Sequence, residues 1–297
     1  MNNTKGVIAY LPLAFGIAWA NWEFVLRHGF AVDNPLFKVL AMPGAVAPAI
    51  AAFIVRMWIT REGFADAGLK IDITKWPYYL VAFFLPLVVV GSLVVLSPLF
   101  GFGSADFTLA RGLREAMPHG VPPPLLEHPW IVVLSLPINA LFATPILFGE
   151  EFGWRSYLQL RLFPERPVLA AVATGIIWGV WHYPINLRGY NYPDHRLVGL
   201  IVFPIATIFL SIIFGWLRMK TRSIWCPSLA HAATNAIGGS LLLLLLGSKN
   251  AIFTSYAGIL GYVPLGLLSA WIVFTGQLKP AASAPGQDGM QAVQAGA

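Results

Sequence analysis

Apolar runs of about 20 residues recur along the whole chain, and they constrain its fold more than any other feature of the sequence. A helix that crosses the hydrocarbon core of a bilayer needs a run of about this length. Hydrophobic residues make up 57% of the chain and charged residues 11%, against about 45–50% and about 25% in soluble domains. The sequence therefore predicts an all-α, polytopic integral membrane protein.

Eight apolar helices are expected, near residues 7–27, 36–58, 77–100, 130–162, 167–187, 197–218, 226–247 and 252–276. The fourth has about 33 residues, or about 50 Å of helix, and Pro137 and Pro145 are expected to kink it. The connections on the side of the termini carry 11 Lys and Arg residues, and the opposite connections carry 7. Because cytoplasmic loops are enriched in these residues, both termini are predicted to be cytoplasmic.

The connections and the ends of the chain give further expectations. Residues 60–76 are predicted to form a polar cytoplasmic loop, and 104–130 a short interfacial helix followed by a Pro-rich stretch that cannot continue it. The small and polar segment 280–297 is predicted to be a disordered tail. Near the start, apolar character continues through Val25, which favours an uncleaved first span over a cleavable signal peptide.

Cysteine content and charge exclude several kinds of site and partner. The single cysteine, Cys226, excludes an internal disulfide and a Cys-rich metal site. The net charge of +6 comes without a long basic run, so no nucleic-acid partner is predicted. The lipid bilayer is the expected surrounding, and the charge reflects cytoplasmic loops.

Three charges stand within the fourth apolar run, in the sequence FGEEFGWR that ends at Arg155. A charged side chain at a helix centre costs about 2.5–3.5 kcal/mol to insert, so such residues tend to mark a function or a buried pair. Glu151 and Arg155 are four residues apart and are expected to pair, which leaves Glu150 without a local partner. The alternative is that the helix ends at Phe148 and the charges lie in water, but apolar residues at helical spacing follow Arg155.

Later runs contain three further polar residues, His182, His231 and Asn235. Each has a simpler interpretation, His182 as a packed side chain among tryptophans and the other two as an interhelical hydrogen-bonded pair. The depths of these residues and of Glu150 in the membrane favour a shared site instead. Counted from the cytoplasmic helix ends at about 1.5 Å per residue, the depths are about 18, 22, 8 and 14 Å for Glu150, His182, His231 and Asn235. All four are therefore predicted to meet in one layer in the inner half of the membrane.

A Glu, two His and an Asn around one buried point that water can reach indicate hydrolysis. A buried carboxylate can act as general base on water, and a His can share the proton or orient the water. A His and an Asn on one helix face can donate hydrogen bonds to an oxyanion. Serine chemistry is disfavoured, because no Ser stands in a nucleophile-elbow sequence.

Three short motifs resemble those of the CPBP family, the CAAX proteases and bacteriocin-processing enzymes, also called the type II CAAX prenyl endopeptidase or ABI family. The family's motifs EExxxR, FxxxH and HxxxN correspond here to Glu150–Arg155, Trp178–His182 and His231–Asn235, in that order and on successive apolar helices. Two positions depart from the pattern. Trp178 replaces the Phe, which we interpret as a conservative aromatic exchange, and Ser156 replaces a common Gly.

The resemblance implies an intramembrane endopeptidase with an eight-helix core. It implies one multi-span domain over residues 1–279, with the catalytic core over about 130–250. The implied catalytic residues are Glu150 and His182, which would activate water, and His231 and Asn235, which would form the oxyanion hole, with Glu151 and Arg155 as supporting residues. The implied partner is a membrane-associated peptide or a prenylated protein. The active site would face the cytoplasmic side of the cell membrane, or of the endoplasmic reticulum membrane in a eukaryote.

Mechanism and class leave alternatives open. A metal-free glutamate mechanism is preferred, so no cofactor is expected, but Glu150, His182 and His231 could instead form a zinc site with an open position. A proton- or ion-coupled transporter is the alternative from another class, since intramembrane ionisable residues also mark ion paths. It would gain support from inverted repeats or paired broken helices, which the sequence does not display. A non-catalytic membrane scaffold or immunity protein is the third possibility.

Overall fold

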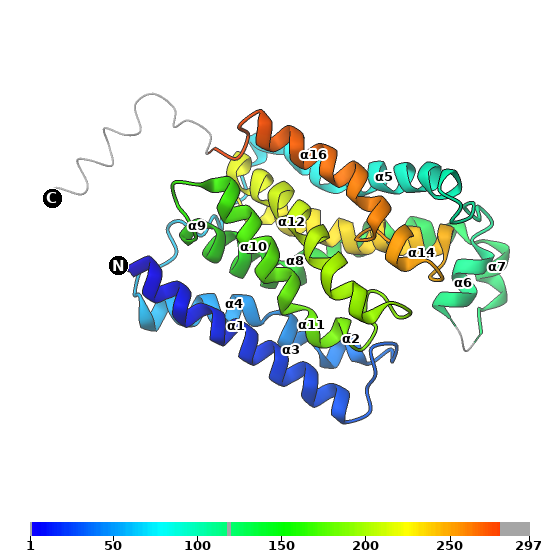
Figure 1. Ribbon diagram of the computed structural model, residues 1–297, viewed down its shortest axis with the longest axis horizontal. Helices are drawn as coiled ribbons and strands as arrows, with labels where there is room; N and C mark the ends of the chain where they lie inside the picture. Colours follow the sequence, from blue (N-terminus) through cyan, green and yellow to red (C-terminus); the bar gives the residue numbers. More distant parts are fainter. Residues whose placement is uncertain (1, 118–119, 280–297) are drawn as a thin grey trace.

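The computed structural model describes residues 2–117 and 120–279, and these residues form helices and connections without a β-strand (Figure 1). Five helices are long and apolar enough to cross a membrane: Ile73–Leu99, Trp130–Arg161, Arg196–Thr221, Trp225–Leu246 and Ala251–Phe274. Shorter apolar helices cover Ala47–Ile59 and Pro167–Trp181. The predicted all-α, polytopic membrane architecture is confirmed, whereas the tail expected over 280–297 lies outside the described residues.

The elements before the site are α1 (Asn2–Arg27), α2 (Phe37–Leu40), α3 (Met42–Ala45), α4 (Ala47–Ile54), η1 (Val55–Ile59), η2 (Ile73–Lys75), α5 (Trp76–Leu99), α6 (Ala110–Ala116) and α7 (Pro123–Glu127). Those that follow are α8 (Trp130–Gly153), η3 (Trp154–Leu158), α9 (Gln159–Arg161), α10 (Pro167–Trp181), α11 (Tyr183–Asn186), α12 (Arg196–Thr221), α13 (Trp225–Ala233), η4 (Thr234–Gly239), α14 (Ser240–Leu246), α15 (Ala251–Thr254), η5 (Ile259–Gly261) and α16 (Tyr262–Phe274). Elements η1, η3 and η4 are π-helical, and η2 and η5 are 3-10 turns.

The expected continuous helix over 36–58 is wrong, because the chain breaks it into α2, α3 and α4. Pro43 and Pro48 each stand in the first turn of a new helix. A proline is favourable there, but it has no N–H with which to continue a preceding helix. Only Ala47–Ile59 remains as an uninterrupted run, and it packs between α1 and α8.

Two other expected helices are interrupted for similar local reasons. The helix expected over 167–187 ends at Trp181, and α11 starts after it. Pro184 cannot donate a hydrogen bond to the carbonyl four residues earlier, so the ladder stops there. The helix expected over 252–276 is interrupted between α15 and η5, where Gly258 lies so close to the carbonyl of Phe253 that a side chain would clash.

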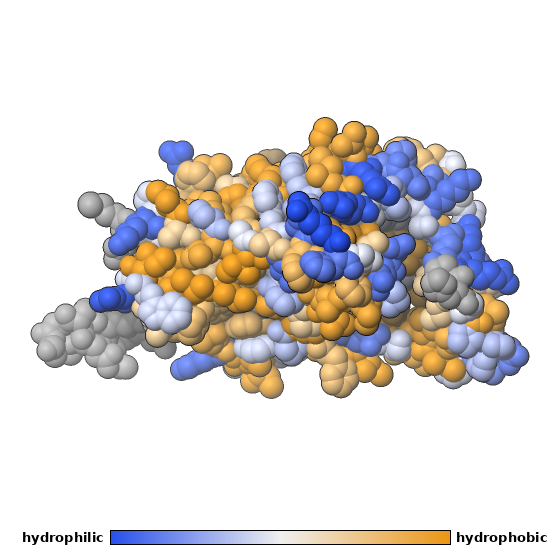
Figure 2. All heavy atoms as spheres, turned by 90° about the horizontal axis from the view of Figure 1, so that it is seen from below, coloured by the Kyte–Doolittle hydropathy of each residue, from blue (hydrophilic) through white to orange (hydrophobic). Residues whose placement is uncertain are grey.

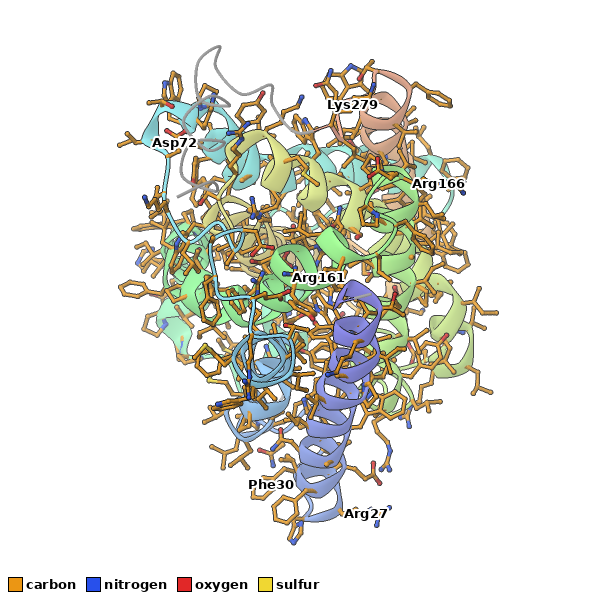
Figure 3. All side chains as sticks on the ribbon, turned by 90° about the vertical axis from the view of Figure 1, so that its left-hand side faces the viewer. Arg27, Phe30, Asp72, Arg161, Arg166 and Lys279 are labelled. Atoms are coloured by element: carbon orange, nitrogen blue, oxygen red, sulfur yellow. The ribbon has the colours of Figure 1, made fainter. Side chains whose placement is uncertain are left out.

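The segments expected in the cytoplasm gather at one end of the molecule. In Figure 1 the start of α1, α9 and the end of α16 lie on the left, and α6 and α7 lie at the opposite end. Figure 3 looks onto the first of these ends, where Asp72, Arg161, Arg166 and Lys279 are labelled.

A cluster of three arginines and two carboxylates joins these segments, and we call it the arginine clamp. Arg56 Nη1 lies 2.7 Å from Asp66 Oδ1, and Arg161 Nη2 lies 2.7 Å from Glu62 Oε1. Arg218 Nη2 donates to the Asp66 carbonyl at 2.7 Å. All three arginines are buried. The loop 60–72 is therefore fixed against η1, α9 and the end of α12 rather than free in water.

The same loop also fixes the two helices that carry most of the site. Ser156 Oγ in η3 donates to the Ala67 carbonyl at 2.6 Å. The Ile224 amide, just before α13, donates to the Gly68 carbonyl at 2.8 Å, and the Trp225 indole donates to Leu69 at 2.9 Å. Backbone contacts of one loop thus set the position of α13 relative to η3.

Helix packing places α8, α10 and α13 around a common interior. Helix α8 packs against α4 and α13, and α10 packs along α12. Close approach of α10 to α12 depends on Gly179, where an added Cβ would lie 2.6 Å from the Cα of Pro204. Outside this interior, apolar side chains cover much of the molecular surface (Figure 2), as expected for a protein that faces lipid.

Candidate active site

Helix α8 carries the two adjacent glutamates in its last turn, just before the backbone becomes π-helical at Trp154. Glu150 is 8% exposed, and Glu151 is fully buried. The alternative that the helix ends at Phe148 is wrong, because the helical run continues to Arg161. π-Helical segments occur often at functional sites, and one begins within each of the motifs that start at Glu150 and His231, so that Arg155 and Asn235 lie in π-helical turns.

Glu151 and Arg155 form the expected pair, and the pair includes a third member. Arg155 Nη1 lies 3.0 Å from Glu151 Oε1, and both side chains are fully buried. The same oxygen lies 2.9 Å from His231 Nδ1. The sequence predicted the first contact but not the second. Glu151 therefore connects the arginine of α8–η3 to the histidine of α13.

Trp178 of α10 lies at the centre of the group. Its indole Nε1–H donates to Glu150 Oε2 at 2.8 Å. The Arg155 guanidinium lies over its ring at 4.4 Å from the ring centroid. The rings of His182 and His231 lie edge-on to it, with centroids 6.0 and 5.1 Å away. The sequence offered one signal for this residue, its place four residues before His182, but its hydrogen-bonding role was missed.

His182 occupies the break between α10 and α11, where the chain leaves the regular helix. Its Nδ1 lies 2.9 Å from the carbonyl oxygen of Trp178. A carbonyl only accepts, so Nδ1 carries the proton, and the Nε2 lone pair of the neutral ring is free to accept one. The side chain is 9% exposed, and the rings of Trp181 and Phe203 flank it at 4.8 Å.

The Nδ1 atom of His231 faces a carboxylate, that of Glu151, rather than a backbone carbonyl. An ionised Glu151 only accepts, so Nδ1 is again the donor. If Nε2 is to donate as well, the ring must carry both protons. Two carboxylates and one guanidinium are buried together here, so a positive imidazolium would balance their charge.

Three of the four predicted catalytic side chains therefore gather around Trp178: Glu150, His182 and His231. Asn235, in η4, is exposed, and its side chain makes no hydrogen bond to any residue that the structure describes. Its amide N–H groups are free for a ligand, but the structure does not join it to the hydrogen-bonded group.

The donor atoms of the alternative zinc site are arranged for other contacts. Within residues 2–117 and 120–279, no three His, Cys, Asp or Glu side chains are grouped so as to hold a metal ion. Glu150 Oε2 accepts from Trp178 and His182 Nδ1 donates to its carbonyl, so these two side chains would offer a metal only Glu150 Oε1 and His182 Nε2.

Fold and site together define a polytopic membrane protein with a buried group of acid–base side chains. Comparison with known proteins gives the family. A model described as type II CAAX prenyl endopeptidase Rce1-like matches residues 128–237, a range that contains all three motifs. CAAX prenyl protease 2 of Methanococcus maripaludis is 23% identical over 196 residues. That alignment covers 63% of this chain and 66% of the relative's length. Both findings confirm the resemblance to the CPBP family of CAAX proteases.

Proposed function

We propose that this protein is an intramembrane endopeptidase that hydrolyses a peptide bond in a membrane-associated or prenylated peptide. The observation that supports it best is the arrangement around Trp178. One carboxylate oxygen of Glu150 and one ring nitrogen of His182 are held by Trp178, so Glu150 Oε1 and His182 Nε2 are left for a water molecule. Both side chains keep a small exposed fraction, which water needs to reach them.

In the proposed reaction, Glu150 takes a proton from water while His182 orients that water and shares the proton. The hydroxide attacks the scissile carbonyl carbon and forms a tetrahedral intermediate. His231 Nε2–H and the Asn235 amide donate hydrogen bonds to its oxyanion. The C–N bond then breaks, and the proton held by Glu150 passes to the leaving amine, so the protein returns to its starting state.

Glu151 and Arg155 are proposed as supporting residues. Arg155 forms a buried ion pair with Glu151, and Glu151 Oε1 in turn accepts a hydrogen bond from His231 Nδ1, which fixes the orientation of that ring. The mechanism assigns no step to a metal, and we propose that the enzyme needs no cofactor.

The proposal includes the membrane topology of the chain. We propose one membrane domain over residues 1–279 with eight crossings, its catalytic core over about 130–250, both termini in the cytoplasm and the site reached from the cytoplasmic side. The common location of α9, the start of α1 and the end of α16 supports this arrangement (Figure 1). The Lys and Arg bias of the connections at that end supports its cytoplasmic assignment.

The test is Glu150→Gln, because the amide preserves shape but cannot take a proton. Purified wild-type and variant proteins in lipid vesicles are given a fluorogenic peptide with a farnesylated cysteine three residues from its C-terminus, and the same peptide without the lipid. We expect turnover to fall by at least about 10²–10⁴-fold, the usual contribution of a general base. Glu23→Gln is the matched control, since Glu23 pairs with Arg27 and Arg188 away from the site.

Three outcomes would contradict the proposal in different ways. Unchanged cleavage by Glu150→Gln removes Glu150 as the general base, whereas absence of cleavage by the wild-type protein removes the hydrolase interpretation and brings forward a transporter or scaffold. Loss of wild-type activity on incubation with a chelator, with recovery on addition of Zn²⁺, keeps the hydrolase but overturns the metal-free mechanism. Cleavage of the farnesylated peptide alone identifies a prenylated substrate, and cleavage of both peptides identifies a broader one.

A further inference from the structure

Trp178 contacts more of the site than any residue that the sequence motifs name as catalytic. Its side chain donates to Glu150, lies under the Arg155 guanidinium and packs edge-on against His182 and His231. Its carbonyl accepts from His182. The residue is 2% exposed, so its N–H has no water to which it can turn.

The exchange of Phe for Trp at this motif position is therefore not conservative in its chemistry. A phenyl ring would keep the packing against the histidines and a surface for the guanidinium. The backbone carbonyl would still hold His182 Nδ1. What a phenyl ring lacks is the indole N–H, and this N–H donates to the carboxylate proposed as the general base.

We propose that Trp178 is a positioning residue that orients the Glu150 carboxylate through its indole N–H. The inference rests on the proposed function. With Oε2 engaged at 2.8 Å, rotation of the carboxylate is restricted, and Oε1 is left for the attacking water. Side chain and backbone of one residue thus fix both partners of the water, Glu150 by the indole and His182 by the carbonyl.

Trp178→Phe tests this role, and the chain offers a matched control. Trp154 is fully buried like Trp178, but its indole N–H has no hydrogen-bond partner within the described residues. Trp154→Phe therefore measures the cost of a smaller buried ring alone. Both variants are expected to lose some thermal stability. Only Trp178→Phe is expected to lose kcat, by about 10- to 100-fold, the value of a hydrogen bond to a charged group. KM should stay unchanged, because the peptide-binding surface is untouched.

The turnover of these variants distinguishes a failure of the Trp178 role from a failure of the proposed function. If Glu150→Gln abolishes turnover but Trp178→Phe and Trp154→Phe have equal kcat, the positioning role is wrong and the endopeptidase stands. If Glu150→Gln retains turnover, Glu150 is not the general base, and the proposed mechanism fails before the role of Trp178 is tested.

A spectroscopic measurement keeps the inference testable if Trp178→Phe does not fold. In protein labelled with ¹⁵N at the indole nitrogens, one indole N–H resonance should move on Glu150→Gln, because its acceptor changes from a carboxylate to an amide. The spectrum of the Glu23→Gln control should keep that resonance in place. An indole region that is unchanged by Glu150→Gln would overturn the hydrogen bond itself.

Discussion

Replacement of Arg155 by Met should destabilise the protein strongly, and a second substitution should restore that stability without restoring activity. Met keeps the unbranched aliphatic part of the side chain and removes the guanidinium with its charge. The variant then leaves Glu151 buried beside His231 without its guanidinium. Glu151→Gln added to Arg155→Met removes the stranded charge as well.

The magnitude follows from the geometry of the pair. Two unit charges 3.0 Å apart attract by about 5 kcal/mol at an effective dielectric constant of about 20. Breaking one partner of a buried pair typically costs about 3–5 kcal/mol, because a buried charge is left unpaired. Replacing both partners by neutral residues is often close to neutral. At about 2–4 °C per kcal/mol, we expect Arg155→Met to lower Tm by about 6–20 °C, and the double variant to recover most of this loss.

The single cysteine provides the assay. Cys226 is fully buried, so a thiol-reactive fluorophore reports unfolding as the detergent-solubilised protein is heated. Turnover of the farnesylated peptide is measured on the same samples below Tm. We expect the double variant to stay inactive, because the neutral amide that replaces the Glu151 carboxylate no longer favours the doubly protonated ring of His231.

Two results would refute this reasoning. A normal Tm for Arg155→Met with abolished turnover would move Arg155 from support into the chemistry. A double variant as unstable as Arg155→Met would show that the cost comes from lost packing of the guanidinium on Trp178 rather than from the stranded charge.

The remaining predictions concern the scaffold around the site. Gly179→Ala should separate α10 from α12, since its Cβ would lie 2.6 Å from the Cα of Pro204, and overpacking of this kind costs about 1–3 kcal/mol. Gly16→Ala is the control, because Gly16 has open space around it. Equal Tm values for the two variants would contradict the prediction. The arginine clamp should weaken in acid. Partial burial acts to raise the pKa of Asp66, but the hydrogen bond and charge of Arg56 and the charge of Arg161 hold it below its usual value. Asp66 then contributes stability above about pH 4 that is lost as the pH falls through its lowered pKa. The Tm of the wild type should therefore fall more steeply below about pH 4 than that of Asp66→Asn. Parallel plots of Tm against pH for the two proteins would exclude the arginine clamp as the cause.

The sequence by itself determined the class of fold and the chemical group at the site. Long apolar runs admit only a membrane protein of helices, because a bilayer leaves no other partner for the backbone. The spacing of four between Glu151 and Arg155 predicted their pair, since residues at this spacing are neighbours on a helix surface. Local rules of this kind need no knowledge of how distant segments pack.

Breaks within the helices were only partly foreseen. Pro43, Pro48 and Pro184 were visible in the sequence, yet whether a proline kinks a helix or ends it depends on what surrounds the freed carbonyl. The structure keeps Pro137 and Pro145 inside one continuous α8 but ends a helix at each of the other three. A neighbouring helix decides such cases, and the sequence does not contain its position.

Contacts across the site depended wholly on the tertiary structure. Glu151 and His231 are 80 residues apart in the chain, and Trp178 and Glu150 are 28 apart. The loop 60–72 sets α13 against η3 through its backbone carbonyls, which accept hydrogen bonds from Ser156, Ile224 and Trp225. For the same reason the motif position of Trp178 predicted an aromatic ring, and only the tertiary structure, which places Trp178 beside Glu150, gave its indole N–H a carboxylate to bind. Periodicity determines which residues a helix presents, but the partner of a buried donor is decided by whichever helix is packed against it.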